Sequence, residues 1–300
     1  MIDFNSFFKE NFAEKDYEKY MQTWLNGIVD EIWFWDTYIA REGWIWKKGF
    51  KDTISYERKF ALESYLDAEC ENTILLDVGS GPFSTCGSQT EVTNLELHAV
   101  DPLAAVYKNI KKRYGIRTKI QPEFAMVERL NEKYDTNTFD IVHMRNALDH
   151  SFNPVLGLLQ LLRVCKIGGK VILCHRDNEA AYERYVGFHQ WNLQVEGENS
   201  FYIWRGNKKF DVSELFGDMI TLKATPAKNR EELHEVIITK VGVGEIETVV
   251  DSFLEIYHRK TFNKLLECLT DEFYKNKEKE ASKIYQYRKK IELLKQKLFI

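Results

Sequence analysis

Residues 74–82 read ILLDVGSGP, an apolar run that ends in an acidic residue and a glycine-rich turn. A second apolar run, residues 98–100, ends in Asp101, twenty-four residues after Asp77. A buried strand that stops at such a turn brings bare backbone close to a ligand, because glycine tolerates positive φ and has no side chain to block approach. An acid that closes the next strand can then accept hydrogen bonds from both ribose hydroxyls of a nucleoside. The turn lacks the third glycine of a dinucleotide fingerprint, so a cofactor without a diphosphate is favoured.

Strands and helices alternate from residue 73 to residue 173, which predicts a parallel sheet. A change of character after residue 200 predicts a short strand at 201–204, a short helix at 212–216 and a closing antiparallel hairpin. The strands of the parallel part are expected at 73–77, 96–101, 116–121, 139–144 and 170–175, and those of the hairpin at 219–224 and 235–241.

Four motifs in this order resemble the class I methyltransferases that depend on S-adenosylmethionine (SAM). They are the glycine turn, Asp101, residues 138–148 (TFDIVHMRNAL) and residues 161–173 (LLRVCKIGGKVIL). The resemblance covers roughly residues 70–240. It implies an α/β fold with a seven-stranded, mostly parallel sheet, an antiparallel closing hairpin and helical additions at both ends. The implied domains are an N-terminal helical cap at 1–60, a Rossmann-like SAM-binding catalytic domain at 70–243 and a C-terminal helical extension at 244–300.

The resemblance also implies which residues hold SAM. The turn supplies backbone for the cofactor, Asp101 holds the ribose, and Met126 stands where the family often carries an adenine-contacting acid, so backbone and apolar contacts are expected there. The implied cofactor contacts are Asp77, Gly79, Ser80, Gly81, Asp101, Pro102, Leu103, Met126, Val127, Arg145 and Asn146.

Three histidine-bearing segments (146–150, 175–179 and 187–192) are expected to converge at the carboxyl edge of the sheet, where ligands of α/β folds bind. A sugar hydroxyl is a poor nucleophile near neutral pH, and imidazole is well matched to take its proton. His150 beside Asp149 is the first choice for the base, with His175 and His189 as alternatives. Each histidine also has a purely structural alternative: a helix cap for His150, a core hydrogen bond for His175 and a surface loop position for His189.

Four further side chains in these loops suit hydrogen bonding to a polyhydroxylated or phosphorylated acceptor: Asn178, Glu179, Gln190 and Asn192. The loop pattern resembles a bacterial subset of the family in small-molecule or polysaccharide-modifying pathways. We therefore expect O-methylation of a sugar, a nucleotide-linked sugar or a similar small molecule. N-methylation of an amine or protein side chain and a non-catalytic SAM-binding scaffold are the alternatives. Linear spacing does not specify a metal ligand set, so the need for a metal stays open.

The two ends of the chain read as helices. Apolar residues recur at steps of three and four from Tyr17 to Trp35, which predicts one helix face. Its aromatic residues either pack on the core or line the substrate pocket, and the two roles are compatible. A similar spacing between Ile284 and Leu298 predicts an amphipathic helix. That helix would either lie on its own domain or form a homodimer contact.

Composition narrows the classes of partner. A net charge of −4 argues against a nucleic-acid partner, which normally meets a basic stripe. No apolar run approaches the ~18 residues of a membrane span, and no secretory signal is visible. The five cysteines are odd in number and lack CxxC spacing, which suits a reducing cytoplasm.

Overall fold

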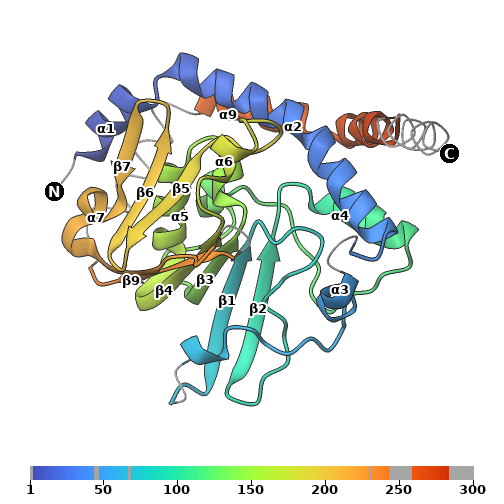
Figure 1. Ribbon diagram of the computed structural model, residues 1–300, viewed down its shortest axis with the longest axis horizontal. Helices are drawn as coiled ribbons and strands as arrows, with labels where there is room; N and C mark the ends of the chain where they lie inside the picture. Colours follow the sequence, from blue (N-terminus) through green and yellow to red (C-terminus); the bar gives the residue numbers. More distant parts are fainter. Residues whose placement is uncertain (1–2, 44–46, 67–68, 230–231, 243–258, 284–300) are drawn as a thin grey trace.

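A six-stranded sheet forms the centre of the fold, in the order β2-β1-β3-β4-β9-β8 (Figure 1). The computed structural model describes residues 3–43, 47–66, 69–229, 232–242 and 259–283. The first four strands run parallel, and β9 lies antiparallel between β4 and β8. The strands are β1 (Asn72–Val78), β2 (Asn94–Val100), β3 (Phe139–Arg145), β4 (Cys165–His175), β8 (Ile220–Thr225) and β9 (His234–Lys240). The expected α/β class with its antiparallel closing hairpin is confirmed.

One expected strand is not formed, so the sheet has six strands and not seven. Residues 116–121 form no strand, and only an isolated bridge joins Glu123 to Val100 of β2. Polar side chains explain the difference. Gln121 donates to the carbonyl oxygen of Thr118, and the ammonium group of Lys111 donates to the side chains of both residues. These local bonds turn the segment back on itself, and β2 remains the edge strand.

A second, three-stranded antiparallel sheet packs beside the first (Figure 1). The sequence predicted only its middle strand and the short helix that follows. The helix begins at an N-cap, Asp211, whose carboxylate accepts the backbone N–H groups of Ser213 and Glu214. The elements of this region are β5 (Asn192–Gly197), β6 (Ser200–Arg205), β7 (Lys208–Asp211), α6 (Glu179–Tyr182) and α7 (Val212–Phe216).

The long N-terminal helix α2 (Glu14–Ala40) lies across the carboxyl ends of the strands (Figure 1). Its apolar face is buried, with Tyr17, Trp24 and Ile28 each at most 3% exposed. These side chains belong to the same hydrophobic cluster as the sheet and α5 (Pro154–Val164). Each buried aromatic or aliphatic side chain contributes on the order of 1.5–3 kcal/mol of transfer free energy. The helix is thus part of the main core.

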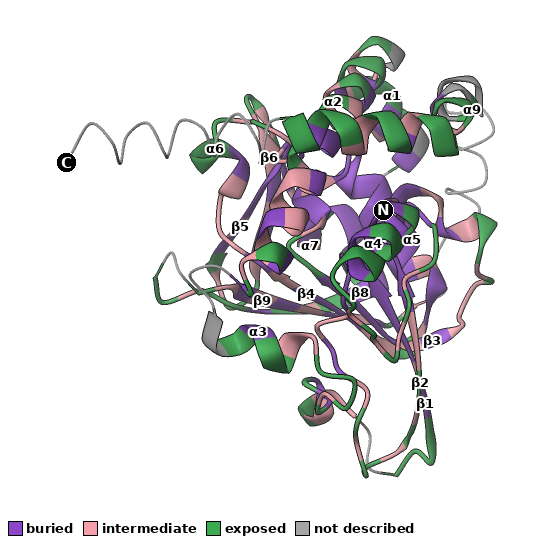
Figure 2. Cartoon of the chain, turned by 90° about the vertical axis from the view of Figure 1, so that its right-hand side faces the viewer, coloured by how far each residue is buried: buried purple, intermediate pink, exposed green. Residues whose placement is uncertain are grey.

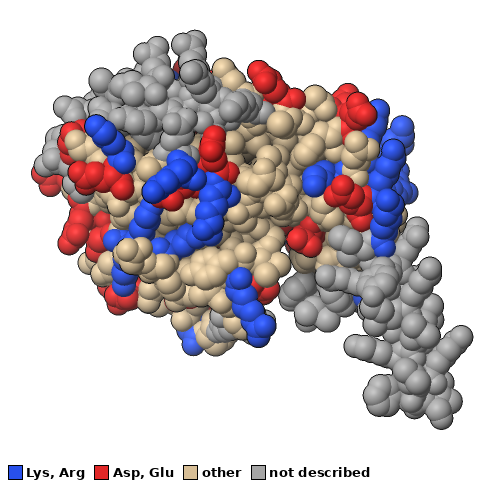
Figure 3. All heavy atoms as spheres, turned by 90° about the horizontal axis from the view of Figure 1, so that it is seen from above, with Lys and Arg blue, Asp and Glu red and all other residues tan. Residues whose placement is uncertain are grey.

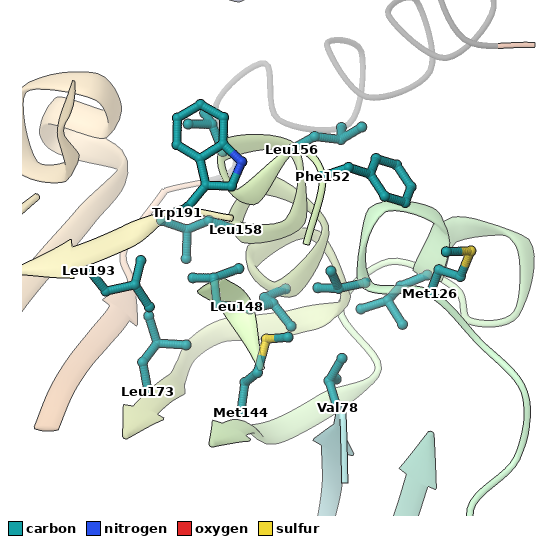
Figure 4. Close-up of a cluster of buried hydrophobic side chains, with 14 of the residues drawn as sticks. Val78, Met126, Met144, Leu148, Phe152, Leu156, Leu158, Leu173, Trp191 and Leu193 are labelled. Atoms are coloured by element: carbon teal, nitrogen blue, oxygen red, sulfur yellow. The ribbon is translucent and has the colours of Figure 1, made fainter. Parts of the chain in front are cut away.

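The main core lies between the sheet and α5 (Figure 4). Helix α5 begins where the Asn153 side chain accepts the backbone N–H of Leu156, with Pro154 in the first turn. Every residue of α5 except Arg163 is buried. Figure 2 shows the buried residues concentrated in the strands and α5, while exposed residues cover the outer faces of α2 and α4 (Ala104–Arg113).

The remaining described helices are α1 (Phe4–Asn11), α3 (Lys47–Thr53), α9 (Arg259–Cys268) and a helix at 271–283. None of the helices that the structure describes combines the length and apolarity needed to cross a bilayer. The helix expected between Ile284 and Leu298 lies outside the described residues.

Figure 3 looks onto the molecule from above the view of Figure 1, and acidic and basic side chains are interspersed on this face. Ion pairs between charged side chains join neighbouring helices. Arg113, at the end of α4, donates to Asp36 of α2 at 2.6 Å and also contacts Glu278.

Replacing Leu159 by Ala tests the packing of α5 against the sheet. Leu159 is fully buried, and its truncation leaves a cavity in the core. We expect the free energy of unfolding to fall by about 2–5 kcal/mol in a urea titration. The exposed Val92→Ala should change it by less than about 0.5 kcal/mol. A similar small change in both variants would contradict the core described here.

Candidate functional site

A cavity of about 770 Å³ opens at the carboxyl ends of β1, β2 and β3, beneath α2. It is lined from the sheet edge by the glycine turn and the strand ends, and from above by the aromatic face of α2. The loop after β3 and the segment between β4 and β5 close its far side. Among the lining residues are Trp24, Glu31, Phe34, Trp35, Tyr38, Asp77, Gly79, Ser80, Gly81, Asp101, Pro102, Tyr107, Met126, Val127, Arg145, Asn146, Asp149, His150, Arg176, Glu179, Glu183, Phe188 and His189.

The glycine turn borders the cavity with bare backbone. Gly79 and Gly81 both adopt φ of +63°, a conformation that favours glycine. A Cβ at Gly79 would lie 2.5 Å from the Cβ of Ala147, and one at Gly81 would lie 2.9 Å from Trp35. Larger residues would therefore displace the neighbouring walls of the cavity.

Asp101 lies beside this turn because β1 and β2 end in register. Val78 pairs with Val100, so Gly79 and Asp101 are the first residues beyond the paired strands. The carboxylate accepts the backbone N–H of Gly81 at 3.0 Å and that of Leu103 at 2.8 Å. Burial raises the pKa of Asp101 to about 7, although these two hydrogen bonds act in the opposite direction. The side chain is held rigidly at the wall of the cavity.

Asp77, at the end of β1, is tied to a histidine that the sequence analysis did not single out. Its Oδ1 lies 2.8 Å from Nδ1 of His143 on β3, and Cys86 contacts the same nitrogen at 3.3 Å. Burial acts to lower the pKa of His143, but Cys86 and Asp77 outweigh it and raise the pKa well above its usual value. The other oxygen of Asp77 is buried without a partner among the described residues. The feature of the sequence that could have identified His143 is its position inside a strand of otherwise largely apolar residues, FDIVHMR.

The remaining residues expected at the cofactor lie on both sides of the turn. Pro102, Met126 and Val127 line the cavity, and the last two are nearly fully buried. Leu103 does not line it, because its side chain belongs to the core and only its N–H serves Asp101. Arg145, Asn146 and Ser80 do line it.

Asp149 gathers two histidines at the other end of the cavity. Its Oδ2 lies 2.8 Å from Nδ1 of His189 and 3.5 Å from Nε2 of His150. The two imidazole rings meet edge to face, with centroids 4.6 Å apart. The backbone N–H groups of Gln190 and Trp191 donate to the Asp149 carbonyl, which joins the two loops.

The surroundings of the three side chains in this cluster shift their pKa values in different directions. Burial opposes ionisation of Asp149, but its interactions with the imidazoles of His150 and His189 hold its pKa well below the usual range. Burial lowers the pKa of His150, only partly offset by Asp149. Burial also acts against the charge of His189, but its hydrogen bond to Asp149 raises the pKa to about 9. Near neutral pH the cluster therefore holds an ionised Asp149–His189 pair beside a neutral His150.

Four residues expected in catalysis or substrate binding are placed outside the cavity lining. His175 is 1% exposed, with Nδ1 3.9 Å from Asp149, and burial lowers its pKa to about 3. Gln190 and Asn192 are fully buried, and Asn192 accepts the backbone N–H of Ala181.

Asn178 accepts from the indole N–H of Trp204. In place of the substrate contacts that we expected, these polar side chains support the loops around the cavity. Of the four residues expected to bind substrate, Glu179 lines the cavity.

Helix α2 contributes cavity residues that the motifs did not reveal. Trp24 and Trp35 combine packing with lining, the two roles that the aromatic periodicity left open. Trp24 stacks on Phe188, with ring planes 4° apart. Glu31 also lines the cavity, and its spacing of four residues from Trp35 on the predicted helix was the signal for it.

Two groups of side chains have the spacing of metal ligands. Asp149, His150 and His189 offer ligand atoms within 4.8 Å of one another, and so does the group of Asp77, Cys86 and His143. In each group a carboxylate is hydrogen-bonded to an imidazole. Because these internal contacts explain the clustering, we assign neither group as a metal site.

Replacing Asp101 by Asn tests the electrostatics of the turn in the protein without ligand. Folding raises the Asp101 pKa from 3.8 to about 7, so its contribution to stability is present below pH 4 and is lost as the pH rises to 7. At about 1.4 kcal/mol per pKa unit, wild type should lose about 4 kcal/mol relative to D101N across this window. Urea titrations at pH 4, 5.5 and 7.5 measure the difference, and parallel curves for the two proteins would contradict it.

Comparisons with known proteins complete the description of the site. Residues 76–173 match the family model of a methyltransferase domain, which spans the glycine turn, Asp101 and the loop after β3. Comparison with curated proteins gives no match.

Three solved structures that resemble this chain differ in how much of it they cover. The CurJ carbon methyltransferase is 12% identical, covering 79% of this chain and 70% of its own, with a TM-score of 0.46. A methyltransferase of Haloferax volcanii in complex with its activator is 13% identical, covering 69% and 97%, with a TM-score of 0.41. An S-adenosylmethionine-dependent methyltransferase assigned in Listeria monocytogenes is 13% identical, covering 60% and 96%, with a TM-score of 0.40.

The matched segment contains the strand ends and turns that form the cavity floor. Residues 76–173 therefore carry a methyltransferase domain, and the protein is a methyltransferase whose cosubstrate is SAM.

Proposed function

We propose that this protein methylates a hydroxyl group of a small polar acceptor such as a sugar, with His150 as the general base. The observation that carries the proposal is the Asp149–His150–His189 cluster in the wall of the same cavity as the glycine turn and Asp101. Proton removal from an alcohol is the step in which imidazole is most useful near neutral pH.

The cavity residues fit a nucleoside cosubstrate at the turn. Gly79 and Gly81 leave backbone uncovered, and Asp101 presents a fixed carboxylate for the ribose hydroxyls. Met126 and Val127 offer apolar surface for the adenine. SAM supplies an electrophilic methyl group when bound. The protein then has to hold the acceptor in line with it and remove a proton, which is largely a matter of position.

His150 is a better candidate for the base than His189 because it is neutral at working pH. A base must be unprotonated before it reacts, and the lowered pKa of His150 meets this condition. His189 carries a proton near neutral pH, held by Asp149 at 2.8 Å. We assign it to orienting the cluster and the acceptor.

The charges of the lining favour a neutral acceptor over a phosphorylated one. Arg176 lies 3.6 Å from Glu179, so its charge is partly matched within the protein. Glu183 adds a further carboxylate to this side. A phosphate would meet these carboxylates, which disfavours the phosphorylated and nucleotide-linked sugars that the sequence left open. The same two glutamates favour the second candidate function, N-methylation of an amine.

A panel of acceptors tests the proposed function directly. Release of S-adenosylhomocysteine is measured with neutral sugars, amino compounds and sugar phosphates. Turnover of neutral sugars above the others is expected, and turnover of amines alone would replace the proposal with N-methylation.

Replacing Gly79 by Ala tests the cosubstrate position. The added methyl would meet Ala147 at 2.5 Å, so the turn has to move, and we expect the affinity for S-adenosylhomocysteine to fall at least ~10-fold, about 1.4 kcal/mol. Gly115→Ala is the matched control, since Gly115 has φ of +66° and open space around its Cβ position. Isothermal titration should find its affinity unchanged. Equal affinities in both variants would remove the turn from the binding site.

Replacing His150 by Ala tests the base. We expect kcat to fall ~10²–10⁴-fold while the affinity for S-adenosylhomocysteine stays within about twofold. The pH–rate profile of the wild type separates the two histidines. With His150 as base, the rate is half-maximal below pH 6.5, whereas with His189 as base it would be half-maximal only at about pH 9. The exposed His98→Ala serves as control.

A further inference from the structure

Glu31 is an acidic side chain of α2 that the matched methyltransferase segment does not contain. It lines the cavity, and its Oε1 accepts the indole N–H of Trp35 at 2.7 Å. Tyr107, on α4, is close enough for Glu31 to contribute to its raised pKa, although burial is the larger cause. The hydrogen-bond partner of the carboxylate is thus a neutral donor, the indole N–H of Trp35. No lysine or arginine in the described part of the chain forms an ion pair with Glu31.

Trp35 places this carboxylate over the glycine turn. The indole packs so closely on Gly81 that a Cβ there would lie 2.9 Å from it. Its ring also meets those of Phe83 and Tyr107 edge to face, each with a centroid distance of 6.1 Å. The residue that orients Glu31 is thus itself held by the turn and by α4.

The charge of Glu31 reaches both ends of the cavity. It raises the pKa of Asp101 at the turn, and it adds to the groups that favour the charged forms of His150 and His189. Glu31 lines the same cavity as the glycine turn and the Asp149 cluster. A ligand group placed there would meet a fixed negative charge flanked by the aromatic side chains of Trp35 and Tyr38.

A fixed carboxylate beside aromatic rings is an environment for a cation without hydrogen-bond donors. The cosubstrate carries such a cation, its sulfonium, whereas the product S-adenosylhomocysteine is a neutral thioether at the same atom. We propose that Glu31 is the residue that makes the cavity bind the charged cosubstrate in preference to its neutral product. The proposal rests on the binding of SAM in this cavity and not on the identity of the acceptor.

Replacing Glu31 by Gln tests this without any acceptor. Dissociation constants for SAM, S-adenosylhomocysteine and sinefungin, in which a carbon bearing an amine replaces the sulfonium, are measured by isothermal titration. We expect E31Q to raise the dissociation constants of SAM and sinefungin about tenfold, or 1.4 kcal/mol, and that of S-adenosylhomocysteine less than threefold. Equal losses for all three ligands, or none, would overturn the proposal, because a ribose contact or a merely structural role would not depend on ligand charge.

Two further variants guard the interpretation. E31D keeps the charge and should keep most of the preference for SAM. It therefore shows whether the preference depends on the charge or on the shape of the side chain. Glu18→Gln, on the exposed side of the same helix, should leave all three constants unchanged. Should E31Q fail to fold, Trp35→Phe removes the N–H that orients Glu31 together with part of the ring that packs on Gly81. The ratio of the dissociation constants for SAM and S-adenosylhomocysteine is therefore compared, and an unchanged ratio in that variant would overturn the proposal. A failed acceptor panel or an active H150A would refute the proposed function while leaving these binding ratios as they are.

Discussion

The hydrogen bond from the Gly81 N–H to the Asp101 carboxylate joins the two features on which the whole site depends. It exists because β1 and β2 end in register, so the turn after one strand and the acid after the next lie side by side. The same carboxylate also accepts the N–H of Leu103. Turn, acid and helix α4 are therefore fixed relative to one another before any ligand arrives, which lowers the entropic cost of binding.

Local patterns in the sequence predicted the elements of the sheet that positions this site. The apolar runs, the glycine turn and the order of the motifs gave β1 to β4 and the closing hairpin, because buried parallel strands are continuous apolar segments. The pattern failed at residues 116–121, where polar side chains bond to Lys111 instead of extending a strand. It also missed β5 and β7, whose short alternations are intelligible only once their partner β6 is in place.

The candidate site was partly predictable for a similar reason. Residues at strand ends, such as Asp77 and Asp101, and residues in the loop that follows a strand, such as His150, follow from topology, because the carboxyl ends of parallel strands share one edge. The inward turn of Gln190 and Asn192 does not follow from composition, since polar loop residues are usually exposed. Contacts between helices far apart in the sequence, such as the ring contact of Trp35 on α2 with Tyr107 on α4, require the fold itself.

The burial of α2 has a consequence for how the cavity can be reached from solvent. Because one face of this helix belongs to the main core, lifting it away would expose several aromatic side chains to water. Arg145, Asn146 and Glu183 line the cavity and are exposed, so the cavity is open to solvent along this flank with α2 in its packed position. An opening on one side of a packed covering helix suits compact acceptors that fit beneath α2.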